Sequence, residues 1–219
     1  MQRVREPELM NEPTQAAAYA AADFAEVNQG FVDRFLDLTP EPDGWIIDLG
    51  CGPGDIALRL CRAAPTLRVL GVDGAAEMIA LARRATSAAG LADRVEWHCA
   101  RLPGAVPGRR FDGVISNSLL HHLPMGEVLW REIEAVAAPG APVLVVDLMR
   151  PESTEAARAL VERYSQGEPE ILRTDFYNSL LAAFTPDEVR AQLESVPGLA
   201  GLEIEAISDR HLAVLGRIG

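Results

Sequence analysis

The chain has 219 residues, and 48% of them are apolar, which is enough to build the core of one α/β domain and little beyond it. Its formal net charge is −12 and all 20 basic residues are arginines, so the acidic balance argues against a nucleic-acid groove. The first residues lack the pattern of a secretion signal, and no apolar run is long enough to cross a bilayer. We therefore expect one domain over residues 1–219, a cytoplasmic location, and neither a nucleic-acid nor a membrane partner.

The composition carries three smaller expectations. A lysine-free, alanine-rich chain suggests a bacterial source with a GC-rich genome. Cys51, Cys61 and Cys99 lack the spacing of metal ligands, so we expect reduced, structural thiols and no metal site. The sequence is compatible with a monomer and with a homodimer.

An amphipathic pattern precedes the first predicted strand. Residues 14–38 place aromatic and aliphatic side chains at helical spacing, which predicts a helix within an N-terminal helical cap over residues 1–40. We expect Phe24, Phe31 and Phe35 to pack between this helix and a sheet.

The most informative motif follows at residues 46–55. An apolar run ends in three alternating glycines, Gly50, Gly52 and Gly54, which indicates a strand turning sharply into a helix. The dinucleotide fingerprint G-x-G-x-x-G would need glycine at position 55, where Asp55 stands. Counted from Asp48, the run resembles motif I of the class I S-adenosylmethionine (SAM) dependent methyltransferases. The alternative is a glycine-rich turn of another α/β protein.

Seven segments are predicted to be strands, namely 44–49, 67–72, 93–98, 111–116, 142–148, 201–208 and 211–217. Helical segments separate the first five, which implies parallel pairing through right-handed crossovers. Only two residues separate the last two, which favours an antiparallel hairpin. The predicted fold class is α/β, and it resembles the doubly wound, mostly parallel seven-stranded methyltransferase sheet, which is Rossmann-like.

The resemblance implies which residues hold the cofactor. Asp73 ends the second strand, where a carboxylate can accept hydrogen bonds from both ribose hydroxyls, although it could instead cap the next helix. Many relatives then carry an acidic residue for the adenine after the third strand, but Arg101 stands here. The SAM-binding set implied by the resemblance is Asp48, Gly50, Cys51, Gly52, Asp73, Gly74, Met78, Arg101, Leu102 and Asn117.

Candidate catalytic residues follow the fourth and fifth strands. His121 and His122 come shortly after Asn117, which the resemblance places beside the transferred methyl group, and either histidine could act as a general base. The alternative is that one of them only caps a helix or bonds the backbone. Asp147 is a further catalytic candidate, and Arg150 could recognise an acidic acceptor.

Residues 150–200 form an insertion before the hairpin, where this family commonly builds a substrate lid. Tyr177 in this insertion and Tyr19 in the N-terminal cap are candidate substrate contacts, and ordinary helix packing is the alternative for the insertion. Thr185 with Glu188 predicts a helix start with a capping box.

The resemblance, in particular to the small-molecule, methyltransferase type 11 or UbiE-like group, implies methyl transfer from SAM to a small-molecule acceptor by in-line displacement. The product of the cofactor would be S-adenosylhomocysteine. Three alternatives stay open: a nicotinamide-dependent oxidoreductase, which the glycine spacing disfavours, a methyltransferase acting on tRNA or protein, and a SAM-binding protein without catalysis.

Overall fold

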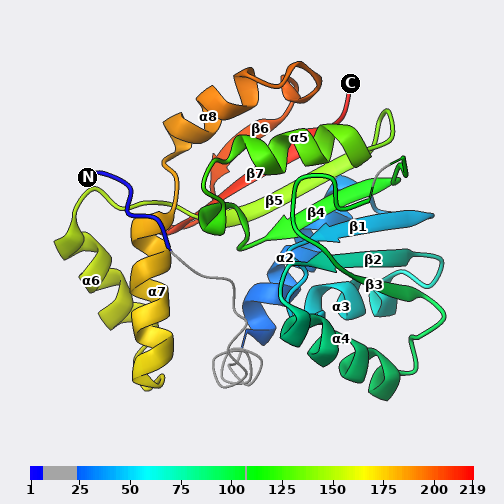
Figure 1. Ribbon diagram of the computed structural model, residues 1–219, viewed down its shortest axis with the longest axis horizontal. Helices are drawn as coiled ribbons and strands as arrows, with labels where there is room; N and C mark the ends of the chain where they lie inside the picture. Colours follow the sequence, from blue (N-terminus) through cyan, green and yellow to red (C-terminus); the bar gives the residue numbers. More distant parts are fainter. Residues whose placement is uncertain (7–23, 107) are drawn as a thin grey trace.

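The computed structural model describes residues 1–6, 24–106 and 108–219. Its centre is a seven-stranded sheet with the order β3-β2-β1-β4-β5-β7-β6 (Figure 1). The strands are β1 (Trp45–Leu49), β2 (Arg68–Asp73), β3 (Val95–Cys99), β4 (Gly113–Asn117), β5 (Pro142–Leu148), β6 (Glu203–Ala206) and β7 (His211–Arg217).

The strand pairing confirms the predicted fold class. Strands β1 to β5 pair in parallel, and β7 pairs antiparallel with both β5 and β6. The order reverses between β1 and β4, which are neighbours although β2 and β3 lie between them in sequence. In open α/β sheets, ligands bind at the carboxyl ends of the strands beside such a reversal. The ends of β1 and β4 are therefore where a site is expected.

Helices cover both faces of the sheet. They are α2 (Ala25–Leu38), α3 (Asp55–Ala63), α4 (Ala76–Ala89), α5 (Glu127–Val136), α6 (Thr154–Tyr164), α7 (Glu170–Ala182) and α8 (Pro186–Glu194), with the short 3₁₀ helices η1 (Leu120–His122) and η2 (Pro197–Leu199). Helices α2, α3 and α4 lie on one face and α5 and α8 on the other (Figure 1). None of the helices in the described ranges is long and apolar enough to cross a membrane.

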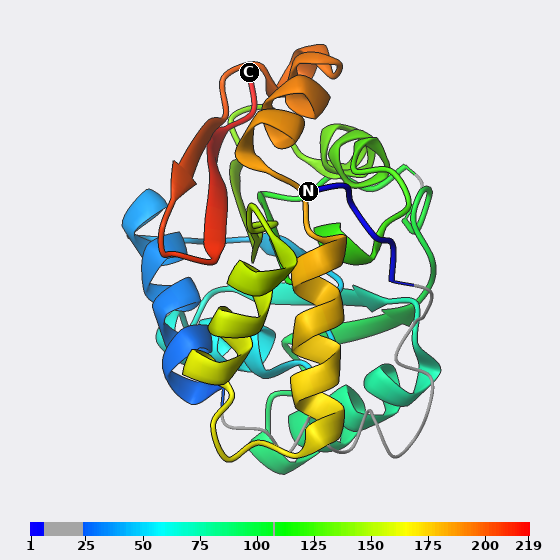
Figure 2. The same cartoon turned by 90° about the vertical axis from the view of Figure 1, so that its left-hand side faces the viewer.

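Helices α6 and α7 form a separate layer beyond the carboxyl end of β5. Figure 2 shows them side by side in front of the sheet. They enclose a small apolar cluster with Leu148, the last residue of β5. The predicted capping box is confirmed, since Thr185 and Glu188 bond each other's backbone N–H groups at the start of α8.

The helix predicted over 14–38 is found from Ala25 to Leu38, and residues 14–23 lie outside the described residues. Residues 1–6 have no regular secondary structure, and Tyr19 lies outside the described residues. Phe31 and Phe35 are buried against the sheet as predicted, whereas Phe24 is 36% exposed, so its prediction as a core residue is wrong. Phe24 is the N-cap residue of α2 and precedes its first turn.

Candidate active site

The glycine turn after β1 has the backbone that only glycine adopts without strain. Gly50, Gly52 and Gly54 have φ values of 76°, 51° and 88°. A Cβ at Gly50 would lie 2.8 Å from the Cβ of Leu119, so the turn packs closely on the segment after β4. A Cβ at Gly52 would meet no atom of the described chain within 4 Å. One side of the turn is therefore a cradle that a side chain would fill and a ligand can use.

Asp73 fixes the open side of this turn. Its Oδ2 accepts the Gly52 N–H at 2.9 Å, and its Oδ1 accepts the Ala75 N–H at 2.8 Å. Burial raises the pKa of Asp73 above its usual value, although these two hydrogen bonds oppose the shift. Each of the two carboxylate oxygens has a second lone pair, so the Asp73 carboxylate can still accept hydrogen bonds from two hydroxyl groups. This geometry fits the ribose of the expected cofactor.

A second carboxylate lies beneath the turn. Asp48, in β1, is 2% exposed, and its burial together with the nearby charge of Asp73 raises its pKa to about 7. A cation beside Asp48 would favour its ionised form and offset the cost of burial. The amino group of the methionine part of SAM is such a cation, so the residues around the turn fit this cofactor.

Asp48 leads to a prediction about pH and stability. The folded protein holds the Asp48 proton up to about pH 7 against a usual pKa of 3.8, so the free energy of unfolding falls as pH rises between these values. Asp48→Asn removes this dependence. Relative to wild type, the cofactor-free variant should gain about 2 to 3 kcal/mol of stability between about pH 5 and about pH 8. Urea unfolding at both pH values measures this, and parallel pH profiles would contradict it.

The other residues expected at the cofactor lie around the ends of β2 and β3. Cys51 is buried in the turn, where its N–H donates to the Val72 carbonyl at 3.0 Å. Met78 is 3% exposed and packs in a small apolar cluster on α4, and Gly74 is half-buried. Leu102 is half-buried against the main core, whereas Arg101 is exposed.

The segment after β4 forms the opposite wall. Asn117, the last residue of β4, is half-buried at the sheet edge. The Ser116 hydroxyl donates to the Leu49 carbonyl at 2.8 Å and so ties the end of β4 to the end of β1. With Leu119 packed on Gly50, this contact holds η1 next to the glycine turn.

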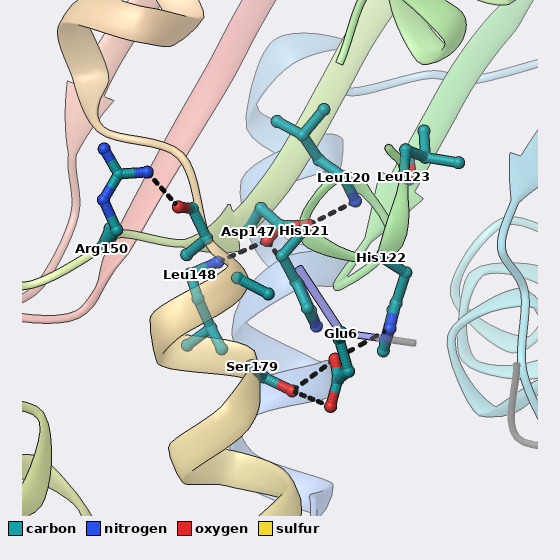
Figure 3. Close-up of polar contacts among 12 residues, drawn as sticks. Glu6, Leu120, His121, His122, Leu123, Asp147, Leu148, Arg150 and Ser179 are labelled. Carbon is teal, nitrogen blue, oxygen red and sulfur yellow. Dashed lines mark hydrogen bonds and ion pairs between the residues drawn. The ribbon is translucent and has the colours of Figure 1, made fainter. Parts of the chain in front are cut away.

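His121 and Asp147 form a buried pair in this wall. They are 3% and 1% exposed, and His121 Nδ1 lies 2.7 Å from Asp147 Oδ1 (Figure 3). Burial alone would lower the pKa of His121, but the charge and hydrogen bond of Asp147 outweigh it and raise the pKa above its usual value. Asp147 also accepts the N–H groups of Leu120 and Leu148. Asp147 is therefore a positioning residue that holds His121, and His121 Nε2 is left for other partners.

His122 meets a residue that the sequence did not suggest. Its Nδ1 lies 3.1 Å from Glu6 Oε2, and the Ser179 hydroxyl donates to the same carboxylate at 3.2 Å (Figure 3). The rings of His121 and His122 have centroids 4.1 Å apart. Glu6 and Ser179 carry no motif, so only the folded chain shows that they belong to this group.

Arg3 holds the segment 1–6 in this place. Its guanidinium donates to the carbonyls of Ala182, His121, Leu123 and Pro124. It also lies 3.8 Å from the ring centroid of Phe184. Contacts with both η1 and the end of α7 fix Glu6 over the histidines.

Two predicted substrate residues have other partners. Arg150 was expected to recognise an acidic acceptor, but its side chain is 6% exposed and its Nη2 lies 2.6 Å from Glu188 Oε1. Its charge is already paired, so Arg150 braces the start of α8. Tyr177 is half-buried against the apolar cluster of α6 and α7, which is the packing alternative considered from the sequence.

Comparison with known proteins agrees with this geometry. The model of a methyltransferase domain family matches residues 46–140. A trans-aconitate 2-methyltransferase of Azoarcus sp. (strain BH72) is 35% identical over 105 residues, covering 48% of this chain and 39% of the relative. A demethylmenaquinone methyltransferase of Thermus thermophilus is 35% identical over 133 residues, covering 60% and 57%. The chain thus spans less than two thirds of the length of both relatives.

Solved structures share the fold. The plantazolicin methyltransferase BpumL in complex with SAH superposes with a TM-score of 0.71 at 14% identity, covering 95% of this chain and 91% of that one. A SAM-dependent methyltransferase from Aquifex aeolicus gives 0.68 at 17% identity, covering 95% and 99%. The chain thus has the fold of solved SAM-dependent methyltransferases, and its residues 46–140, which include the glycine turn, match a methyltransferase domain family.

Proposed function

We propose that the protein transfers the methyl group of SAM to a small-molecule acceptor. The observation that carries this proposal is the open side of Gly52, next to the Asp73 carboxylate, whose pKa burial raises and the charge of nearby His122 partly lowers. It supplies a place for the methyl donor beside polar groups that can bind an acceptor.

Methyl transfer requires little from the chain beyond positioning the acceptor. Bound SAM would supply a methyl group made electrophilic by its sulfonium, and a bond from the acceptor to that carbon would form as the carbon–sulfur bond breaks, with the electron pair going to sulfur. The chain's contribution is to hold the acceptor in line with that bond. We propose that Asp147 orients His121, and that His121 and His122 bind the reacting group of the acceptor or receive its proton.

A small acceptor is favoured by charge and by the relatives. The net charge of −12 disfavours a polyanionic acceptor. The two relatives described above are named for small-molecule acceptors. Other matches include a release factor glutamine methyltransferase and a 23S rRNA methyltransferase, so a macromolecular acceptor is the second candidate. The cytoplasmic and bacterial setting stays a prediction.

A SAM-binding protein without catalysis and catalysis other than methyl transfer are further alternatives. The [4+2]-cyclase SpnF shares this fold, with a TM-score of 0.61 at 19% identity. The fold alone therefore does not fix the reaction.

Calorimetry followed by turnover tests the proposal. The protein should bind SAM and S-adenosylhomocysteine and should not bind NAD. A panel of small carboxylic acids, phenols and amines is then incubated with methyl-labelled SAM, and label should appear in at least one acceptor. Failure to bind either adenosyl ligand at millimolar concentration would refute the proposal, and transfer to tRNA or protein alone would favour the second candidate.

A further inference from the structure

Three potential metal ligands converge at the edge of the site. Glu6, His121 and His122 each offer one ligand atom, and these atoms lie within 4.8 Å of one another. Within the described ranges, no other group of three or more histidine, cysteine or acidic residues meets this spacing. Figure 3 shows the two rings and the Glu6 carboxylate turned toward one another.

His121 is prepared as a ligand by its other ring nitrogen. Asp147 is ionised and can only accept, so His121 Nδ1 carries the proton of their 2.7 Å bond. In the neutral ring Nε2 then keeps a lone pair, for which a metal ion would compete with a proton. A carboxylate behind the far nitrogen of a histidine is the usual outer partner of metal-bound imidazoles, because it fixes the ring and increases its basicity.

His122 has a buried nitrogen without an aligned hydrogen bond. Its Nδ1 is 3.1 Å from Glu6 Oε2, yet this buried atom has no partner with hydrogen-bond geometry in the described chain. An N–H donated to a carboxylate at that distance would be expected to point at the oxygen. A lone pair on this nitrogen would be available to a third partner that it shares with Glu6.

Glu6, like His121, is held in place by a neighbouring side chain. Its carboxylate is 12% exposed, and the Ser179 hydroxyl donates to it from α7. Arg3 anchors the segment that carries it through four backbone carbonyls. His121 and Glu6 thus each have an outer partner, Asp147 and Ser179 respectively.

We propose that Glu6, His121 and His122 bind a divalent transition-metal cation, with zinc(II) as the best fit. Two imidazoles and one carboxylate suit zinc and its neighbours in the first transition row, whereas magnesium and calcium prefer oxygen ligands throughout. Bonds of about 2.1 Å in tetrahedral geometry place ligand atoms about 3.4 Å apart, so side-chain shifts of about 1 Å would close the site. A fourth position would stay open for water or an acceptor oxygen.

The role of the cation, but not its binding, rests on the proposed function. An acceptor oxygen on the open position would lose its proton to solvent more readily, so neither histidine would need to act as a base. The alternative is an ordinary ion pair between Glu6 and His122 that takes no metal.

Titration of chelator-stripped protein with zinc chloride and cobalt chloride tests the site. All variants carry Cys99→Ser, because this exposed thiol could bind metal itself. Glu6→Gln and His122→Gln each remove one ligand. Glu168→Gln and His98→Gln make the same changes at exposed positions outside the group. Calorimetry gives affinity and stoichiometry, the visible spectrum of cobalt(II) reports its ligands, and thermal unfolding confirms that each variant folds.

One zinc ion per chain should bind, at least tenfold more weakly in Glu6→Gln and in His122→Gln than in either control. Cobalt should give a visible spectrum in the controls that both ligand variants lose. The proposal is overturned if neither metal binds at millimolar concentration, or if folded ligand variants bind like the controls. SAM binding measured on the same preparations keeps this outcome separate from the proposed function, which survives if SAM binds and metal does not.

Discussion

Replacing Asp73 by alanine is expected to weaken binding of SAM about 10- to 100-fold, which corresponds to about 1 to 3 kcal/mol. The variant loses the carboxylate placed to accept both ribose hydroxyls. It also loses the bonds that hold Gly52 and Ala75 in position. Calorimetry with S-adenosylhomocysteine and with its 2′-deoxy analogue separates these two causes. The wild type should prefer the parent ligand, and the variant should bind both alike.

The matched control is Asp112→Ala at the other end of the sheet. Asp112 also accepts a backbone N–H, from Trp45 at 2.8 Å. Its loss should lower stability and leave cofactor affinity unchanged. If the preference for the 2′-hydroxyl survives in Asp73→Ala, the ribose assignment is wrong.

Gly52→Ala should reduce SAM affinity at least tenfold because the new methyl group enters the space assigned to the cofactor. Gly140→Ala is the control, since both glycines have positive φ, 51° and 77°, and a Cβ on either would meet no atom of the described chain within 4 Å. Each of the two variants therefore carries a similar backbone strain of about 1 to 2 kcal/mol. Thermal unfolding should show similar losses for the two variants, while calorimetry should show lost SAM affinity for Gly52→Ala alone. Equal affinities would place the cofactor elsewhere.

Much of the fold could be predicted because its signals are local. Strands β1, β2 and β5 contain apolar runs, and the glycines at 50, 52 and 54 mark a backbone that few other residues adopt. The capping box of α8 spans only four residues. Such patterns are complete within one segment of sequence, so one sequence suffices to interpret them.

The acceptor side of the site depends on contacts between distant segments. Glu6 meets Ser179 across 173 positions, and His121 meets Asp147 across 26. Arg150 resembled a ligand only because its partner Glu188 lies 38 positions away. No periodicity or spacing rule encodes these pairings, since tertiary packing alone decides which buried charges meet.

The two ends of the α6–α7 layer are adjacent in space. Met149 forms a parallel bridge with Phe184, and the Arg150 N–H donates to the Phe184 carbonyl at 3.2 Å. The chain therefore leaves the sheet and returns at nearly the same point, as in insertions that can be exchanged without disturbing their host. Replacing residues 151–183 by the matching part of a relative should thus leave the sheet and its glycine turn folded, which thermal unfolding measures.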